Sequence, residues 1–182
     1  MKIFIAGSRG ITNLNKPFED RLHGIYEKDY YVLVGDANGV DKAVQKYFSN
    51  LNYQNVTVYA SNGKARTNVG NWSVESVWVP ESAKDFDFYA EKDKAMAHCA
   101  DFGLMLWNGE SRGTLTNIVN LLNRGKRVLV YFTPMSSFTN VDNFVKLELL
   151  IGFCGSNVQK LYERVNNNHA YSQQQISLFE GI

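Results

Sequence analysis

Three turns rich in glycine and in hydroxyl or acidic side chains carry the chemistry that this sequence could do. They occupy residues 7–10, 35–39 and 108–114, and each follows a short apolar run. A turn between a buried strand and a helix directs backbone N–H groups and the positive end of the helix dipole outward. That arrangement suits an anion, most often a phosphate. A single turn is weak evidence, whereas three of them favour one shared site.

The segments around these turns predict strands that alternate with helices. We expect strands at residues 2–6, 31–34, 55–60, 74–79, 102–107 and 127–132. We expect helices at residues 17–28, 40–50, 86–99, 115–122 and 141–153. This alternation is typical of an α/β fold, and it predicts a Rossmann-like, doubly wound, mainly parallel sheet with helices on both faces. Ligands bind outside the carboxyl ends of the strands in such sheets, which is where the three turns would lie.

Length and composition indicate a globular domain with a sizeable core, because 182 residues include 45% hydrophobic and 20% charged side chains. We expect this domain to cover residues 1–155, followed by a helical or flexible tail at residues 156–182. The net charge is +1 and no large basic cluster is present, so we expect nucleic acid not to be a partner. No apolar run approaches the length of a membrane span, and the N-terminus leads straight into a strand. We therefore expect a cytoplasmic protein with no membrane partner.

Five short motifs occur in the order and spacing of a known group of proteins. They lie at residues 3–9, 34–41, 92–96, 100–101 and 111–114. The chain therefore resembles the SLOG superfamily, the Rossmann-like group that contains the SMF/DprA proteins and the LOG (lysine-decarboxylase-like) phosphoribohydrolases. It is most similar to the small single-domain branch with Gly-Ser-Arg, Gly-Val-Asp and Ser-Arg-Gly-Thr motifs. The resemblance covers roughly residues 1–133. It implies a protein that binds a nucleotide or a nucleotide-derived ligand, as a sensor or as a sequestering protein.

The turns and the resemblance together predict how the ligand is held. The phosphate would rest on residues 7–9 and 111–114, and the ribose hydroxyls would meet Asp36 or Asp41, with Lys92 nearby. Trp107 ends a strand at a position from which it could stack on a base, although burial in the core is the stronger alternative for it. The predicted ligand-binding residues are Gly7, Ser8, Arg9, Gly35, Asp36, Asn38, Gly39, Asp41, Lys92, Trp107, Gly109, Ser111, Arg112, Gly113, Thr114 and Asn117.

Asn117 separates a binding protein from an enzyme. The LOG enzymes that this chain resembles carry a catalytic glutamate three residues after the threonine that corresponds to Thr114. This chain has Asn117 at that position. An amide cannot serve as a general base, so we favour binding over cleavage. The alternative is an N-glycosidase, phosphoribohydrolase or deoxyribosyltransferase in which Asp36, Asp93 or Glu110 replaces the glutamate. We expect no cofactor and no metal, because the three histidines lack the spacing of a metal site or a triad.

The apolar segment at residues 141–151 predicts self-association. Its hydrophobic residues go almost round the expected helix, which is typical of burial on more than one side. Many SLOG relatives form dimers, so we expect a homodimer or a higher homo-oligomer.

The end of the chain offers a further partner. Gln175, Leu178 and Phe179 belong to a pentapeptide that resembles the motif by which many bacterial proteins dock on the replicative sliding clamp. Such a peptide would place its Leu-Phe pair in an apolar pocket while the glutamine binds at the rim. The stronger alternative is that these residues fold back on the core of the domain itself.

Overall fold

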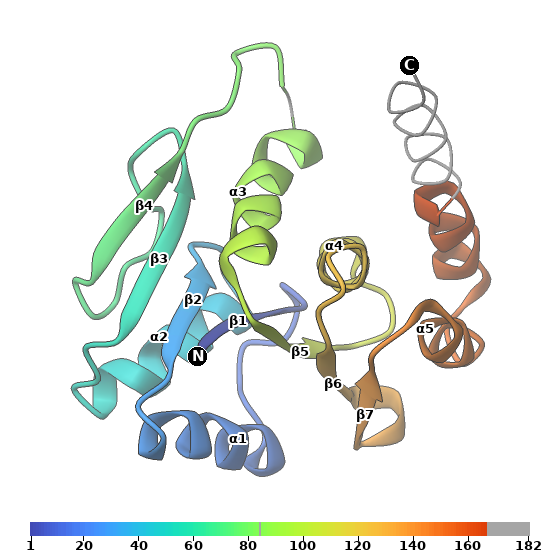
Figure 1. Ribbon diagram of the computed structural model, residues 1–182, viewed down its shortest axis with the longest axis horizontal. Helices are drawn as coiled ribbons and strands as arrows, with labels where there is room; N and C mark the ends of the chain where they lie inside the picture. The colour runs from blue at the N-terminus through green and yellow to red at the C-terminus, as the bar shows by residue number, and fades with distance from the viewer. Residues whose placement is uncertain (84, 167–182) are drawn as a thin grey trace, which may run out of the picture.

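A seven-stranded sheet organises residues 1–83 and 85–166, the part of the chain that the computed structural model describes (Figure 1). The strand order is β4-β3-β2-β1-β5-β6-β7. All neighbouring strands are parallel except β6 and β7, which are antiparallel. The strands are β1 (Lys2–Gly7), β2 (Tyr31–Gly35), β3 (Val56–Ser61), β4 (Ser73–Val77), β5 (Phe102–Trp107), β6 (Val128–Phe132) and β7 (Ser137–Val141).

Helices cover both faces of this sheet, and each face has its own apolar cluster. Alternate residues of a strand point to opposite faces, so Ile3 and Ile5 pack with α1 (Lys16–Glu27) and α2 (Val40–Asn50). Phe4 and Ala6 instead pack with α3 (Asp85–Cys99) and α4 (Arg112–Leu122) on the other face. Figure 1 shows α1 and α4 on opposite sides of the sheet. The predicted Rossmann-like, doubly wound fold is confirmed.

Side-chain caps explain where several helices begin. The Asn15 side chain accepts a hydrogen bond from the backbone N–H of Phe18, and this caps α1. Ser111 caps α4 in the same way, by accepting from the backbone N–H of Thr114. Because the cap lies at Ser111, α4 begins at Arg112, three residues earlier than the sequence predicted. The third glycine-rich turn therefore supplies the first turn of a helix.

The segment after β6 differs from the prediction. Residues 141–153 were expected to form one helix, but Val141 is the last residue of β7 and pairs with Val128 of β6. A short 3-10 turn at Thr133–Met135 and a left-handed Ser136 reverse the chain, which makes this antiparallel pairing possible. The helix α5 (Phe144–Ile151) then begins after Asn143, whose side chain accepts from the backbone N–H of Lys146. Val141 is fully buried because it lies in the sheet.

The first part of the expected tail, residues 156–166, is helical. Val158 and Tyr162 are buried in the same apolar cluster as α4 and α5. The division of the chain at residue 156 stays a prediction. The clamp-like motif with Gln175, Leu178 and Phe179 lies outside the described residues. Within the described ranges, no helix is both long enough and apolar enough to cross a membrane.

Candidate functional site

The candidate site lies where the winding of the sheet changes direction. The chain leaves β1 towards β2, β3 and β4, whereas β5 leads to β6 on the other side. The carboxyl ends of β1 and β5 therefore flank the crevice in which α/β proteins bind ligands. A cavity of about 580 Å³ opens there. It is lined by Ala6, Gly7, Ser8, Arg9, Gly10, Ala37, Asp41, Phe86, Tyr89, Ala90, Lys92, Asp93, Asn108, Glu110, Ser111, Arg112, Gly113 and Asn117.

Hydrogen bonds connect the first and third turns at the base of the cavity. The Ser8 backbone N–H donates to the Leu106 carbonyl at 3.0 Å, and the Ser8 hydroxyl donates to Asn108 Oδ1 at 2.8 Å. Asn108 Oδ1 also accepts from the backbone N–H groups of Glu110 and Ser111, each at 3.1 Å. These contacts hold Ser8, which is fully buried, beside the N-terminus of α4. Asn108 was missed by the sequence analysis, although an Asn-Gly pair in a turn was a usable signal.

The N-terminus of α4 faces the cavity with room to spare. A Cβ atom placed on Gly113 would meet no heavy atom within 4 Å. The first backbone N–H groups of a helix have no partner inside the helix, and they favour negative charge in front of them. This turn can therefore accept an anion close to its backbone.

Two arginines extend over aromatic rings of α3 at the cavity. The guanidinium carbon of Arg112 lies 3.8 Å from the ring centre of Phe86, and that of Arg9 lies 5.6 Å from the ring centre of Tyr89. Among the residues that the structure describes, neither guanidinium makes a hydrogen bond or an ion pair. Both therefore keep their donors available for an anionic ligand.

A buried charge cluster lies at the end of β2, behind the cavity. The Asp36 carboxylate accepts hydrogen bonds from Arg66 Nε at 3.0 Å, from Nη2 at 2.6 Å and from the backbone N–H of Arg66 at 3.1 Å. Lys92 Nζ lies 2.7 Å from Asp93 Oδ1 and 3.8 Å from Asp36 Oδ1. Burial favours neutral Asp36, but Arg66 and Lys92 outweigh this and hold its pKa below the ordinary value. Asp36 is consequently an ionised partner of Arg66.

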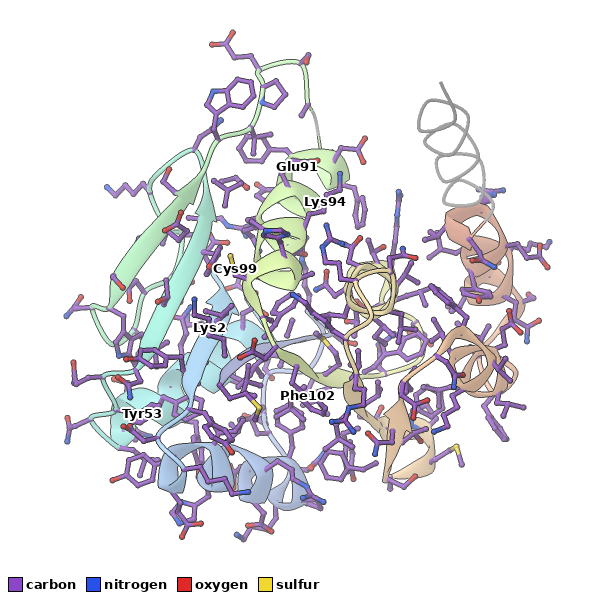
Figure 2. The ribbon with its side chains drawn as sticks, viewed as in Figure 1. Lys2, Tyr53, Glu91, Lys94, Cys99 and Phe102 are labelled. Atoms are coloured by element: carbon purple, nitrogen blue, oxygen red, sulfur yellow. The ribbon has the colours of Figure 1, made fainter. Side chains whose placement is uncertain are left out.

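Lys92 remains charged although it is almost completely buried. Burial lowers the pKa of a lysine, but the neighbouring carboxylates Asp93, Asp41 and Asp36 raise that of Lys92 above its usual value. Its ammonium group is thus already neutralised by carboxylates. Lys94, two residues further along α3, pairs with Glu91 at 2.6 Å and does not line the cavity. Figure 2 shows Glu91 and Lys94 together on this helix.

Asp41 is the carboxyl group that burial affects most. Burial raises its pKa to about 6, against the opposing charge of Lys92, and its Oδ2 accepts from the Ala37 backbone N–H at 3.2 Å. Gly35 makes room for this arrangement. A Cβ on Gly35 would overlap Asp41 Oδ2 and would lie 2.8 Å from Lys92 Nζ. The space above Gly35, which was predicted for a ligand, is filled by these two side chains.

The cavity brings together nine of the sixteen predicted ligand-binding residues. They are Gly7, Ser8, Arg9, Asp41, Lys92, Ser111, Arg112, Gly113 and Asn117. The other seven, Gly35, Asp36, Asn38, Gly39, Trp107, Gly109 and Thr114, do not line it. Of the two carboxylates predicted to meet the ribose hydroxyls, Asp41 lines the cavity and Asp36 does not.

Several residues in the second group make contacts within the protein itself. Trp107 is fully buried against Phe132, and its indole N–H donates to the Ser111 carbonyl at 3.2 Å, so its ring is not available to a base. Gly39 has a φ of 79°, and a Cβ there would lie 2.6 Å from Arg9 Cα. It is therefore required by the contact between the first two turns. The Thr114 hydroxyl donates to Ser111 Oγ and stabilises the helix cap.

The three acidic residues considered for catalysis lie in different environments. Asp36 is clamped by Arg66, and Glu110 is exposed at the cavity rim. Asp93 lines the cavity, with Oδ1 on Lys92. When the Asn117 amide is oriented to satisfy its surroundings, its nitrogen donates to Asp93 Oδ2 and to the Gly113 carbonyl, each at 3.3 Å. Asn117 thus connects Asp93 of α3 to the first turn of α4.

The aromatic wall of the cavity was missed by the sequence analysis. Phe86, Tyr89 and Asp93 are spaced by three and four residues, so they share one face of α3. That spacing was visible in the sequence, but residues 86–99 were predicted only as a helix. The wall could have been found by asking which face of α3 turns towards the glycine-rich turns.

The strand order and the position of the cavity define a Rossmann-like α/β protein with a site at the topological switch point. The sequence matches no protein-family model and no curated protein. The fold is similar to that of DNA processing protein A (DprA) from Streptococcus pneumoniae, with a TM-score of 0.53 and 16% identity over 71% of this chain. It is also similar to DprA from Helicobacter pylori, with a TM-score of 0.58 and 12% identity over 93% of this chain and 80% of that one.

These likenesses show a shared fold, which is the Rossmann-like fold that the SLOG motifs predicted. The chain spans about half of the S. pneumoniae structure, 49% of its length. The H. pylori structure is described as showing a unique mode of single-stranded DNA binding. A protein with this fold thus binds nucleic acid, and our expectation that nucleic acid is not a partner was wrong. That expectation depended on the net charge and on the lack of a large basic cluster in the sequence, and neither shows how Arg9 and Arg112 are arranged in space.

Proposed function

We propose that this protein binds a nucleotide, with the phosphate between the first and third turns of the cavity. One observation carries the proposal: Arg9 and Arg112 extend over aromatic rings beside the N-terminus of α4, with no carboxylate partner among the described residues. An arginine fork and the free N–H groups of a helix start are both suited to phosphate oxygens. The other two basic residues near the site, Lys92 and Arg66, are each paired with an aspartate.

The nucleotide is either free or a unit of single-stranded DNA, because both present the same phosphate and base. The small SLOG branch suggested by the motifs supports a free nucleotide or a nucleotide-derived ligand. The single-stranded DNA binding described for the H. pylori protein supports the second source. The cavity, at about 580 Å³, is within the range of about 300–1,000 Å³ that is usual for small-molecule sites.

Calorimetry with the four ribonucleoside monophosphates, and with a short single-stranded oligonucleotide, tests the proposal and separates the two sources. Arg9→Ala and Arg112→Ala should each remove a charge-assisted hydrogen bond and weaken binding by about 1.5–3 kcal/mol. Arg21→Ala is a matched control, because Arg21 also lies over a ring, 5.1 Å from the centre of Phe138, but does not line the cavity. Unchanged affinity in both cavity variants would place the ligand elsewhere.

Cleavage of an N-glycosidic bond remains the second candidate function. Among the three acids considered for it, Asp93 has the most suitable position. Asp93 is the candidate whose carboxylate lies on α3 inside the cavity, although Lys92 and Asn117 hold it. The protein would be incubated with nucleoside monophosphates, NAD and ADP-ribose, and released base would be measured by chromatography. Release at catalytic rates that disappears in Asp93→Asn would establish an enzyme, whereas no release supports binding alone.

A further inference from the structure

Two aromatic rings of α3, Phe86 and Tyr89, line the cavity, and they differ in how firmly their faces are covered. Tyr89 has the guanidinium carbon of Arg66 at 4.2 Å from its ring centre and that of Arg9 at 5.6 Å. Arg66 is fixed by two side-chain hydrogen bonds and one backbone hydrogen bond to buried Asp36. The face of Tyr89 under Arg66 is thus closed by a residue that a ligand could displace only by breaking a partly buried ion pair and leaving the buried Asp36 carboxylate without this partner.

Phe86 is covered in a different way. Its ring face carries the Arg112 guanidinium at 3.8 Å, and in the described part of the chain Arg112 makes no hydrogen bond or ion pair. Arg112 lies in the first turn of α4, next to Gly113, where the phosphate is proposed to bind. A phosphate at this helix start would attract the guanidinium more strongly than an aromatic ring does, because an ionised pair outweighs a cation–π contact.

We propose that Phe86 is the stacking platform for the base of the bound nucleotide, on the ring face that Arg112 covers in this structure. This inference rests on the proposed function, because Arg112 leaves the ring for the ligand's phosphate. One movement of one side chain then does two things. It completes the phosphate site at α4, and it opens an aromatic face in the same cavity.

The charges and the volume of the cavity support this division. The carboxylates of Asp41 and Asp93 line the part of the cavity near Lys92, where a phosphate would be repelled. The arginines and the start of α4 are therefore the part of the cavity that favours the anionic end of the ligand, and the one carboxylate beside them, Glu110, is exposed at the rim. The rest of the lining includes three small apolar side chains, Ala6, Ala37 and Ala90, in addition to the two rings of α3. Small apolar side chains next to an aromatic face leave room for a planar, uncharged group such as a base.

The test compares two ligands that share the sugar phosphate. Binding of adenosine 5′-monophosphate and of ribose 5-phosphate is measured by calorimetry for the parent protein, Phe86→Ala, Phe86→Leu and Phe86→Tyr. Phe88→Ala is the matched control, because Phe88 lies on the same helix but does not line the cavity. Loss of a base–aromatic stack should weaken binding of the nucleotide about 5-fold to 150-fold in Phe86→Ala. Phe86→Leu should also weaken binding of the nucleotide, and Phe86→Tyr should keep most of the affinity.

The two ligands separate failure of this inference from failure of the proposed function. The expected result is a selective loss, in which Phe86→Ala and Phe86→Leu weaken the nucleotide but leave ribose 5-phosphate unchanged. Equal weakening of both ligands would mean that Phe86 only supports the fold of α3, and no weakening would mean that the base lies elsewhere. Either result overturns the stacking role while the phosphate site stands. If the parent protein binds neither compound and does not bind a single-stranded oligonucleotide, both the proposed phosphate site and the stacking role of Phe86 are wrong.

Discussion

Ionisation of Asp41 should make the free energy of unfolding fall between pH 4 and pH 7. Burial raises the pKa of this carboxyl group from 3.8 to about 6 in the folded protein. The folded state therefore holds a proton in a pH range where the unfolded chain has lost it, so stability decreases as pH rises through this window. A shift of roughly two units, at about 1.36 kcal/mol per unit, corresponds to about 3 kcal/mol.

Two of the neighbouring charges, Asp36 and Lys92, do not titrate in the same window. The pKa of Asp36 is held below its ordinary 3.8 by Arg66, so the stability that this pair contributes is lost only in more acidic solution. The pKa of Lys92 is raised above 10.5, so Lys92 stays protonated throughout. The pKa shifts of Asp36 and Lys92 therefore do not account for the change that Asp41 should cause between pH 4 and pH 7. Asp41→Asn is the appropriate variant, because an amide oxygen can still accept the hydrogen bond from Ala37.

Urea unfolding of the parent and of Asp41→Asn at pH 4, 5, 6 and 7 measures this effect. Other groups titrate in both proteins and cancel in the difference between them. We expect the stability of the variant relative to the parent to increase by up to about 3 kcal/mol from pH 4 to pH 7. The absolute offset between the two proteins depends on how well the new amide is hydrogen-bonded, whereas its change with pH depends on the ionisation of Asp41. A difference that stays constant over this pH range would refute the argument.

Three further changes test the turns and the exposed face of α5. Gly39→Ala should destabilise the protein by about 1–3 kcal/mol in urea unfolding, because the φ of Gly39 is 79° and a Cβ there would lie 2.6 Å from Arg9 Cα. Gly10→Ala is the control and should have little effect, because a Cβ on Gly10 would meet no heavy atom within 4 Å. Gly113→Val should leave the melting temperature almost unchanged, since open space surrounds Gly113, and yet abolish calorimetric binding of adenosine 5′-monophosphate by filling the approach to α4. Val145, Leu149 and Phe153 are 66–68% exposed along one side of α5 and its C-terminal end. We therefore expect light scattering to give the mass of a homodimer, and Leu149→Glu to convert it to a monomer. A parent protein that has the mass of a monomer at all concentrations would contradict this.

Local signals were sufficient to predict most of the fold. The helix α2 was predicted with the bounds that the structure has, Val40–Asn50, because a glycine with positive φ precedes it and its apolar residues recur with helical spacing. The parallel strands were predicted from apolar runs that end in turns. The error at Val141 has a physical reason, since the segment at 137–141 is short and only partly buried. Its strand conformation depends on pairing with β6, which no local pattern reveals.

The candidate site was predicted in position but not in its contacts. The turns were assigned to one site because the carboxyl ends of parallel strands lie at the same edge of a sheet, and the cavity indeed brings residues 7–9 and 111–113 together. The pairing of Asp36 with Arg66 joins residues 30 positions apart, and the loop that carries Arg66 has no periodicity from which its path could be inferred. Asp36 was therefore predicted to contact a ligand, although a buried carboxylate of this kind is satisfied by the protein itself.

Net charge misled the prediction of partners for a related reason. A value of +1 is the sum over 19 basic and 18 acidic residues, and it contains no information on which of them are paired. In the structure, Lys92, Arg66 and Lys94 face aspartates or glutamates, while Arg9 and Arg112 face aromatic rings. Two cations with available donors at the end of a helix create a positive region that the sum does not show. A nearly neutral protein can therefore present a site for phosphate, because binding depends on the charges that remain unpaired at the cavity.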